Sequence, residues 1–459
     1  MFRTLFAILF FLSSITTRLN AQALLMTDTP TTSDTVLQQL QHATGLTIQT
    51  FPLSTVSSSA ADWKEAPVII LQTGCDERPD PYGNGPADWM KHYEQSLFDF
   101  PTGHVCTLTG KMPRHKRLAI SKRQVTADDY AGRLFRLVSN IRREAPATRL
   151  FILSPQISTS PSPTGLSTSQ WTIPTTENQL RLVAQMLCIP FVVDIQHDLV
   201  PYSFVWQQRR PHVGNVLILG DSYSEQKRWV RQFSELCEAT IVNLGVGSAT
   251  LRDRFDYHTH PYISTPRSTD NEGNHNAMAC QLEKLKRLIK GDAKTDETPL
   301  PADFQPDIIF IEGGTNDHPD AGNVEAGYAT AAIQADRTNF CGSLKYLCEQ
   351  LRQLYPNARI YAVTPSGLYY GHTDQPFAYI QKANQIRRAA QLLHIGTVDW
   401  DREGRLTFVF NNSAGTGNGT KAHPFRYNAE TAETRDLLHP NDQGARYLAE
   451  TAIATLLRD

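Results

Sequence analysis

The sequence predicts an α/β protein made of two three-layer α/β/α, flavodoxin-like domains, each built around a parallel sheet. Two observations support this prediction: short apolar runs alternate with helical stretches, and the first half of the chain repeats strand-bearing segments of the second. The 459 residues suffice for two or three domains. The chain is 40% hydrophobic and 20% charged, with a formal net charge of −2. This globular balance gives no basic surface for nucleic acid, so we expect no such partner.

Five short apolar runs in the second half are separated by stretches with helical periodicity. The runs cover residues 216–219, 240–244, 307–311, 359–363 and 395–398, and two of the helical stretches are 340–355 and 380–393. Fully apolar strands between helices are typical of a parallel sheet that is buried on both faces. Right-handed crossovers would then place helices on both sides of the sheet.

The first half repeats these segments in the same order. At an offset of 193, residues 24–29 align with 217–222, and 47–48 align with 240–241. Residues 68–74 align with 308–314 at an offset of 240, and 149–155 with 359–365 at an offset of 210. Residues 178–192 align with 384–398 at an offset of 206, and 8 of these 15 positions are identical. Matches that keep one order predict an internal repeat of domain size. The alternative is two unrelated α/β domains with similar strand composition.

The N-terminus has the features of a signal peptide covering residues 1–23. Arg3 supplies a positive charge, and residues 5–12 form an apolar run too short to span a bilayer as a helix. Ala21 and Ala23 are small residues at the positions that a signal peptidase reads. We therefore expect cleavage near Ala23, export to the periplasm or the medium, and no membrane span in the mature chain; a short anchor or a buried core helix is the alternative.

The mature chain is expected to contain an N-terminal domain over residues 24–200 and a C-terminal domain over residues 211–459. The short segment 201–211 would join them, with no low-complexity linker, so the two domains should pack against each other. The seven cysteines form no CxxC pair, and their spacing indicates no zinc site.

Four blocks in the second half place polar residues at the ends of predicted strands or before a helix. Gly220, Asp221 and Ser222 directly follow a buried strand, at the edge of an open sheet where ligands bind. The other blocks cover residues 243–248, 313–317 and 436–440. In this order, the four blocks resemble those of the SGNH (GDSL-type) hydrolase family over about residues 215–459. The resemblance implies that the C-terminal domain is catalytic.

A serine hydroxyl is a poor nucleophile until a base takes its proton, and His439 can be that base for Ser222. Asp436, three residues before the histidine, can orient the imidazole and stabilise its charged form. We therefore expect a catalytic triad of Ser222, Asp436 and His439, with no cofactor and no metal ion.

The resemblance also implies an oxyanion hole, which stabilises the negative charge of the tetrahedral intermediate. Its donors would be the backbone N–H of Ser222, a backbone N–H of Gly247 or Ser248, and the side-chain amide of Asn316. The family usually has a glycine where this chain has Ser248, so the choice between Gly247 and Ser248 stays open at this point.

Two other segments are expected to be loops around the site. His258, His260 and His275 are spaced too loosely for a metal site, so we interpret their segment as a polar loop at the mouth of the active site. Residues 411–427 contain three glycines and could shape an acyl or sugar pocket.

The first copy lacks the residues that this chemistry needs. Thr29 stands at the nucleophile position, and Asp76 replaces Asn316 with a side chain that, when ionised, accepts but does not donate. Asp194 and His197 have the spacing of the final block but follow a strand directly, so we interpret them as non-catalytic. We expect a degenerate SGNH-like copy that serves packing, orientation or substrate binding.

The function predicted from the sequence is an exported serine esterase that removes acetyl or other short acyl groups from carbohydrate. A lipid or thioester hydrolase, a non-catalytic glycan-binding protein and an acyl transferase acting on sugars are the alternatives. The expected partner is therefore an acylated small molecule or glycan.

Overall fold

The computed structural model describes the chain in segments, which cover both predicted domains. They are residues 22–27, 34–52, 66–72, 137, 138, 141, 145, 147–154, 180, 181, 184, 188–252, 277–317, 329, 337, 339–366, 378–406 and 439–459. Among these residues, no helix is both long enough and apolar enough to cross a membrane.

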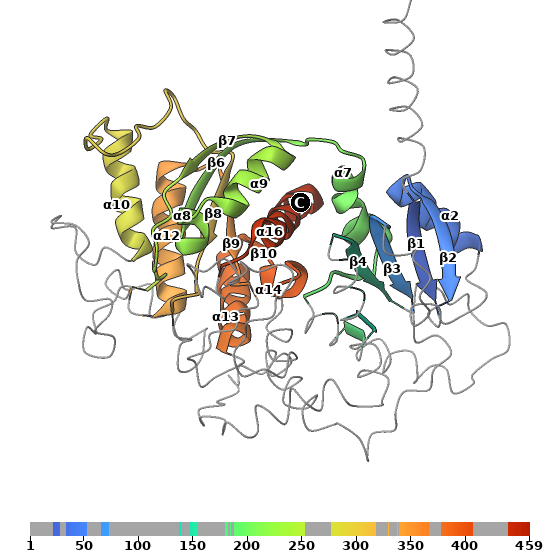
Figure 1. Ribbon diagram of the computed structural model, residues 1–459. Coiled ribbons are helices and arrows are strands. Elements are labelled where there is room, and N and C mark those ends of the chain that lie inside the picture. The colour runs from blue at the N-terminus through green and yellow to red at the C-terminus, as the bar shows by residue number, and fades with distance from the viewer. Residues whose placement is uncertain are drawn as a thin grey trace, which may run out of the picture.

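The second half contains a parallel sheet of five strands, as predicted (Figure 1). Its strand order is β10-β9-β8-β6-β7. The strands are β6 (His212–Gly220), β7 (Glu238–Asn243), β8 (Ile308–Glu312), β9 (Arg359–Val363) and β10 (Gly396–Val398). Each predicted apolar run therefore forms, or contributes to, one strand.

Helices cover both faces of this sheet, which gives the predicted three layers. One face packs against α10 (Met278–Ile289), α12 (Phe340–Leu354) and α13 (Ala378–Leu393). The other packs against α9 (Arg228–Leu236) and α16 (Asp442–Arg458). The alternation of strand side chains explains the two faces: Leu217 and Leu219 belong to the first core, and Val216 and Ile218 to the second.

The first half contains a second parallel sheet of five strands, in the order β2-β1-β3-β4-β5. Its elements are β1 (Gln22–Thr27), α2 (Asp34–Thr44), β2 (Thr47–Pro52), β3 (Val68–Gln72), β4 (Arg149–Leu153) and β5 (Phe191–Val192). All five residues of β3 are buried, as expected for a strand covered on both faces.

The two sheets share one strand order: counted along each half, the strands stand second, first, third, fourth and fifth. Their pairing registers are also equivalent. Ala23 pairs with Ile48 and Val68, and Val216, which lies 193 residues later, pairs with Ile241 and Ile308. The equivalent pairs between the third, fourth and fifth strands are Val68 with Arg149 and Ile152 with Phe191, against Ile308 with Arg359 and Ala362 with Thr397. The offsets of 193, 240, 210 and 206 found in the sequence are therefore the offsets that relate the two sheets.

The predicted connection between the domains is folded rather than extended. It contains η5 (Val200–Tyr202) and α7 (Ser203–Trp206), which follow η4 (Ile195–Leu199). The Trp206 indole donates a hydrogen bond to the Thr44 carbonyl at 2.8 Å. One hydrophobic core contains buried residues from both halves, including Phe151 of β4 and Tyr447 of α16, and Figure 1 shows α16 between the two sheets.

Candidate active site

Ser222 is the first residue of α8 (Ser222–Glu225) and lies directly beyond the carboxyl end of β6. Asp221 caps this short helix, because its carboxylate accepts a hydrogen bond from the Tyr223 N–H at 2.9 Å. A Cβ atom at Gly220 would collide with the Ser224 hydroxyl, so the close turn requires glycine. The turn thereby presents Ser222 at the strand edge where the sequence predicted it.

The same turn is bound to two neighbouring elements, α10 and β7. The Gln281 side chain of α10 accepts from the Gly220 N–H at 2.9 Å and donates to the Gly220 carbonyl at 2.7 Å. The Asn243 amide at the end of β7 donates to the Ser224 carbonyl at 2.7 Å. The position of Ser222 is therefore fixed by bonds to residues on both sides of it.

His439 lies next to Ser222, and its Nε2 atom is 2.8 Å from Ser222 Oγ. The histidine stands just before α16, where Asn441 caps the helix by accepting the Gly444 N–H at 2.9 Å. The His439 and Tyr223 rings are in contact, with centroids 5.5 Å apart. The structure thus brings together the predicted nucleophile and the predicted base, whereas Asp436 lies outside the described residues.

Besides Ser222, the predicted oxyanion residues are Gly247, Ser248 and Asn316, which lie on two loops that are bound to each other. Asn316 Nδ2 donates to the Ala249 carbonyl at 3.0 Å, and the Asp317 carboxylate accepts the Leu251 and Arg252 N–H groups at 2.9 and 3.1 Å. These bonds tie the loop after β7, which carries Gly247 and Ser248, to the end of β8.

Ser248 adopts a φ angle of 62°, in the left-handed region that favours glycine. This conformation gives a physical reason for the glycine that the SGNH family usually has at this position. Serine occupies it here at some cost in backbone strain.

Glu312, at the end of β8, supports the turn that carries Ser222 and was not singled out from the sequence. Its side chain is buried, and its Oε2 atom accepts the Asp221 N–H at 3.1 Å and the Ser224 hydroxyl at 2.8 Å. Burial raises the pKa of Asp221 to about 6. Burial and the neighbouring Asp221 charge together raise the pKa of Glu312 well above its ordinary value. The available signal was an acidic residue at the end of an otherwise apolar strand.

Lys382 of α13 supports the segment that carries Asn316. The lysine is buried, and its Nζ atom donates to the Thr315 carbonyl at 2.9 Å. Burial lowers its pKa to about 8, although the charges of Asp317 and Asp221 act in the opposite direction. This residue, too, was absent from the sequence-based site.

The second Asp-x-x-His pair lies on the protein surface. Asp194 caps η4 by accepting the Gln196 N–H at 2.8 Å and the His197 N–H at 3.3 Å. The His197 side chain is 62% exposed and contacts Asp198. These are the contacts of a helix start, which fits the interpretation of the pair as non-catalytic.

Several predicted residues lie outside the part of the chain that the structure describes. They are Thr29, Asp76, His258, His260, His275, residues 411–427 and Asp436. Within the described part, no cluster of three or more His, Cys, Asp or Glu side chains could hold a metal ion.

Comparison with known proteins gives one family match. The sequence model of the GDSL-like Lipase/Acylhydrolase family matches residues 218–447, just over half of the 459 residues, and this range includes Ser222, Asn316 and His439. None of the curated proteins matches the chain significantly.

Three of the solved structures similar to this chain illustrate the range of relatives. A member of the lipolytic protein G-D-S-L family from Veillonella parvula is 14% identical, with 52% of this chain and 96% of that chain covered and a TM-score of 0.28. A carbohydrate acetylesterase from Sinorhizobium meliloti is 14% identical, with 53% and 97% covered and a TM-score of 0.29. An acetylxylan esterase from Geobacillus stearothermophilus is 15% identical, with 54% and 95% covered and a TM-score of 0.27.

Proposed function

Since the chain belongs to the GDSL-like lipase/acylhydrolase family, and is therefore an ester hydrolase, we propose that it removes acetyl or other short acyl groups from carbohydrate. The observation that carries the catalytic assignment is the 2.8 Å distance between Ser222 Oγ and His439 Nε2 at the carboxyl end of β6. A nucleophile within hydrogen-bond reach of a base is the arrangement that acyl transfer through a serine needs.

In the proposed reaction, Ser222 Oγ attacks the acyl carbon while His439 Nε2 takes the hydroxyl proton. The intermediate collapses when the histidine returns this proton to the leaving alcohol, and the acyl group stays on the serine. Water then attacks the acyl-enzyme while His439 takes its proton; the bond between the acyl group and Ser222 Oγ breaks, the histidine returns the proton to Oγ, and the carboxylic acid is released. Asp436 would hold the imidazole through its other nitrogen.

The oxyanion of each tetrahedral intermediate would accept hydrogen bonds from the backbone N–H of Ser222, from the backbone N–H of Gly247 or Ser248, and from Asn316. The bonds that fix the Asn316 and Asp317 loop before substrate arrives support this assignment. Donors that are already held in place cost no reorganisation during the reaction.

The choice of a carbohydrate ester rests on the polar sequence near the motifs. Residues 256–276 include His258, His260, Asn274 and Asn276. Such a segment suits a hydroxyl-rich alcohol better than a long acyl chain, which needs an apolar trough. A release assay on acetylated oligosaccharides, run beside p-nitrophenyl esters of increasing chain length, tests the proposal. Preference for acyl chains longer than about butyl would favour a lipid or thioester hydrolase instead.

We further propose that the N-terminal half is a degenerate SGNH-like copy of the C-terminal half. The shared strand order and the equivalent registers support this origin. The family match does not add support, because it begins only at residue 218. With Thr29 and Asp76 in place of a serine and an asparagine, the copy would be inert.

Export of the protein after cleavage near Ala23 is the last part of the proposal. β1 begins at Gln22, so cleavage after Ala23 would remove the first two residues of this strand and leave Leu24–Thr27. One of the two removed residues, Ala23, is fully buried. N-terminal sequencing of protein recovered from outside the cytoplasm tests both the export and the cleavage site. An intact N-terminus on that protein would contradict the signal peptide.

A further inference from the structure

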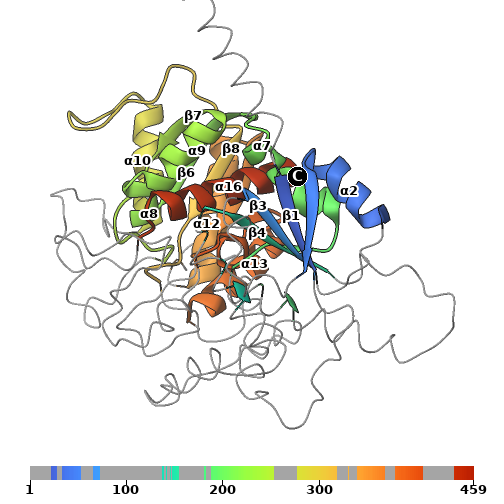
Figure 2. The same cartoon turned by 45° about the vertical axis from the view of Figure 1, so that its right-hand side comes forward.

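α16 connects the candidate active site to the N-terminal sheet. Its first turn lies directly after His439 and Pro440, and twelve of its 17 residues are buried. A helix that is buried around most of its circumference packs between two bodies rather than on one surface. Figure 2 shows α16 extending from the neighbourhood of α8 towards β1 and β3, and one hydrophobic core includes Tyr447 and Ile453 of α16 together with Phe151 and Leu153 of β4.

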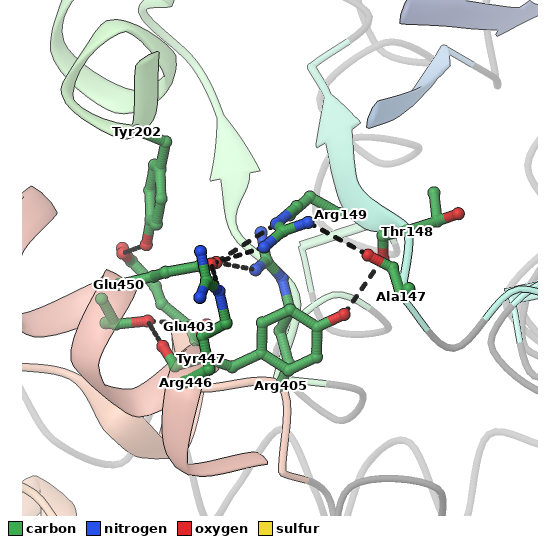
Figure 3. Close-up of polar contacts among 10 residues, drawn as sticks. Ala147, Thr148, Arg149, Tyr202, Glu403, Arg405, Arg446, Tyr447 and Glu450 are labelled. Carbon is green, nitrogen blue, oxygen red and sulfur yellow. Dashed lines mark hydrogen bonds and ion pairs between the residues drawn. The ribbon is translucent and has the colours of Figure 1, made fainter. Parts of the chain in front are cut away.

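A buried carboxylate lies in the middle of this helix. Glu450 has a side-chain exposure of 0% and accepts hydrogen bonds from three arginines (Figure 3). Arg149 of β4 donates from Nη2 to Oε1 at 2.7 Å and from Nε to Oε2 at 3.4 Å. Arg446 and Arg405 donate at 3.2 and 3.4 Å. Arg149 is therefore the partner with the shortest bond to Glu450, and it is the one that comes from the N-terminal sheet.

Further contacts connect α16 and its neighbours to the N-terminal half. The Tyr447 hydroxyl donates to the Thr148 carbonyl at 3.4 Å, and the Arg149 guanidinium lies 5.9 Å from the centre of the Tyr447 ring. Near the other end of the helix, Glu403 accepts from Tyr202 at 2.9 Å and from Arg458 at 2.8 and 3.0 Å. Contacts at separated points along a helix oppose both its rotation and its sliding.

The position of α16 matters for the reaction because the two reacting groups stand on different elements. Ser222 follows β6, inside the C-terminal sheet, whereas His439 precedes α16. A helix rises about 1.5 Å per residue, so Glu450 lies roughly 12 Å from the first residue of α16. Because the helix moves as a unit, a shift at Glu450 also moves the end of α16 that follows His439. A catalytic group displaced by about 1 Å can lose on the order of a hundredfold in rate.

We infer that Arg149 is a positioning residue for His439: through its two bonds to Glu450, the N-terminal sheet sets the place of α16 and thereby of the base beside Ser222. This inference rests on the proposed function, because it concerns the same serine and histidine. Of the roles expected from the sequence, which were packing, orientation and substrate binding, it favours orientation. The domain contributes to kcat without touching the substrate.

The test compares Arg149→Ala, Arg149→Gln and Arg149→Lys with the wild type in the full-length protein. Two readouts are measured: the rate at which a fluorophosphonate labels Ser222 with loss of fluoride, and kcat and KM on p-nitrophenyl acetate. Arg287→Ala is the matched control, since Arg287 also makes two bonds to a glutamate, Glu297, at 2.9 and 3.2 Å, but on α10. Melting temperatures are recorded for every variant.

We expect Arg149→Ala and Arg149→Gln to lower the labelling rate and kcat at least tenfold with less than a twofold change in KM. Arg149→Lys, which keeps the charge, should restore part of the loss, and Arg287→Ala should leave both rates unchanged. If Arg149→Ala does not fold, the comparison of Arg149→Gln with Arg149→Lys carries the test.

Folded Arg149 variants that melt earlier but label and turn over like the wild type would overturn the inference alone, because Arg149 would then be merely structural. An equal loss in Arg287→Ala would overturn it as well. A wild-type protein that is not labelled at Ser222 would overturn the proposed function and this inference with it.

Discussion

His439 Nε2 and Ser222 Oγ lie 2.8 Å apart although 217 residues separate them in the chain. The contact forms because the turn after β6 and the segment before α16 meet at the carboxyl edge of the C-terminal sheet. Nothing in the local sequence of either segment requires the contact; it depends on the packing of α16, which also contacts the other domain.

Replacing either member of this pair should remove most of the activity. Ser222→Ala deletes the proposed nucleophile and His439→Ala the proposed base, and such changes typically cost on the order of 10⁶ in kcat. The loss should appear in kcat on p-nitrophenyl acetate while the melting temperature stays near that of the wild type. Purified Ser222→Ala protein that kept more than a few per cent of wild-type activity would refute the assignment.

Asn316→Ala should lower kcat by roughly 10²–10³, because the proposed oxyanion hole would lose one fixed donor. Asn316 also bonds to the Ala249 carbonyl, so stability must be measured beside activity. Asn316→Asp is the informative partner variant, since it keeps the shape of the side chain but replaces the amide donor by an acceptor. A purely structural Asn316 would show a lowered melting temperature with nearly normal kcat.

Much of the fold could be predicted because parallel strands that are buried on both faces appear in the sequence as short, continuous apolar runs. The apolar run 307–311 contains most of β8, and the alignment of 68–74 with 308–314 located the equivalent strand β3 in the first half. The location of Gly220, Asp221 and Ser222 was predicted correctly. Because these residues lie between a strand and the helix that follows it, they must stand at the carboxyl edge of the sheet. Periodicity and order therefore suffice for the sheets and for the location of the nucleophile turn.

The supporting residues could not be predicted, because each acts through a partner far away in the chain. Glu312 is 88 residues from Ser224, and Arg149 is 301 residues from Glu450. A glutamate within α16 looks like an ordinary helix residue in the sequence. Glu450 becomes a buried acceptor only when the N-terminal sheet packs on α16 and brings Arg149 to its carboxylate.

The buried pair of Asp221 and Glu312 should make stability fall as pH rises. Burial raises the pKa of Asp221 from 3.8 to about 6, so between these values the folded protein binds more protons than the unfolded chain. Glu312 extends the effect to higher pH, since its pKa is raised well above 4.5. The free energy of unfolding, measured with urea from pH 4 to pH 8, should therefore decline less steeply in Glu312→Gln, whose amide carries no charge.

Glu297→Gln provides the control of opposite sign. Burial would raise the pKa of Glu297, but hydrogen bonds from Arg287 and Lys294 lower it overall. The contribution of Glu297 to the free energy of unfolding is therefore present above pH 4.5 and is lost as the pH falls below that value. Stability curves for the wild type and Glu312→Gln that run parallel across the range would show that Glu312 does not titrate differently on folding.

Removing residues 24–200 should give an insoluble protein rather than an independent esterase. The deletion would remove the N-terminal part of the shared hydrophobic core and so expose apolar surface around Tyr447, together with the buried Glu450. A large apolar surface of this kind favours aggregation. A soluble fragment 201–459 with wild-type kcat would show that the shared core is dispensable.

The N-terminal copy itself should contribute no chemistry, and Thr29→Ala tests this directly. Thr29 aligns with Ser222, and Asp194 and His197, which have the spacing of the final block in the proposed copy, form a helix start at the surface of the described structure. Thr29→Ala should therefore leave kcat unchanged on the substrate for which Ser222→Ala abolishes it. Measuring the two variants side by side, in protein of equal melting temperature, separates a working second site from an inert one. A loss in Thr29→Ala as severe as that in Ser222→Ala would mean that the first copy is itself a catalytic domain.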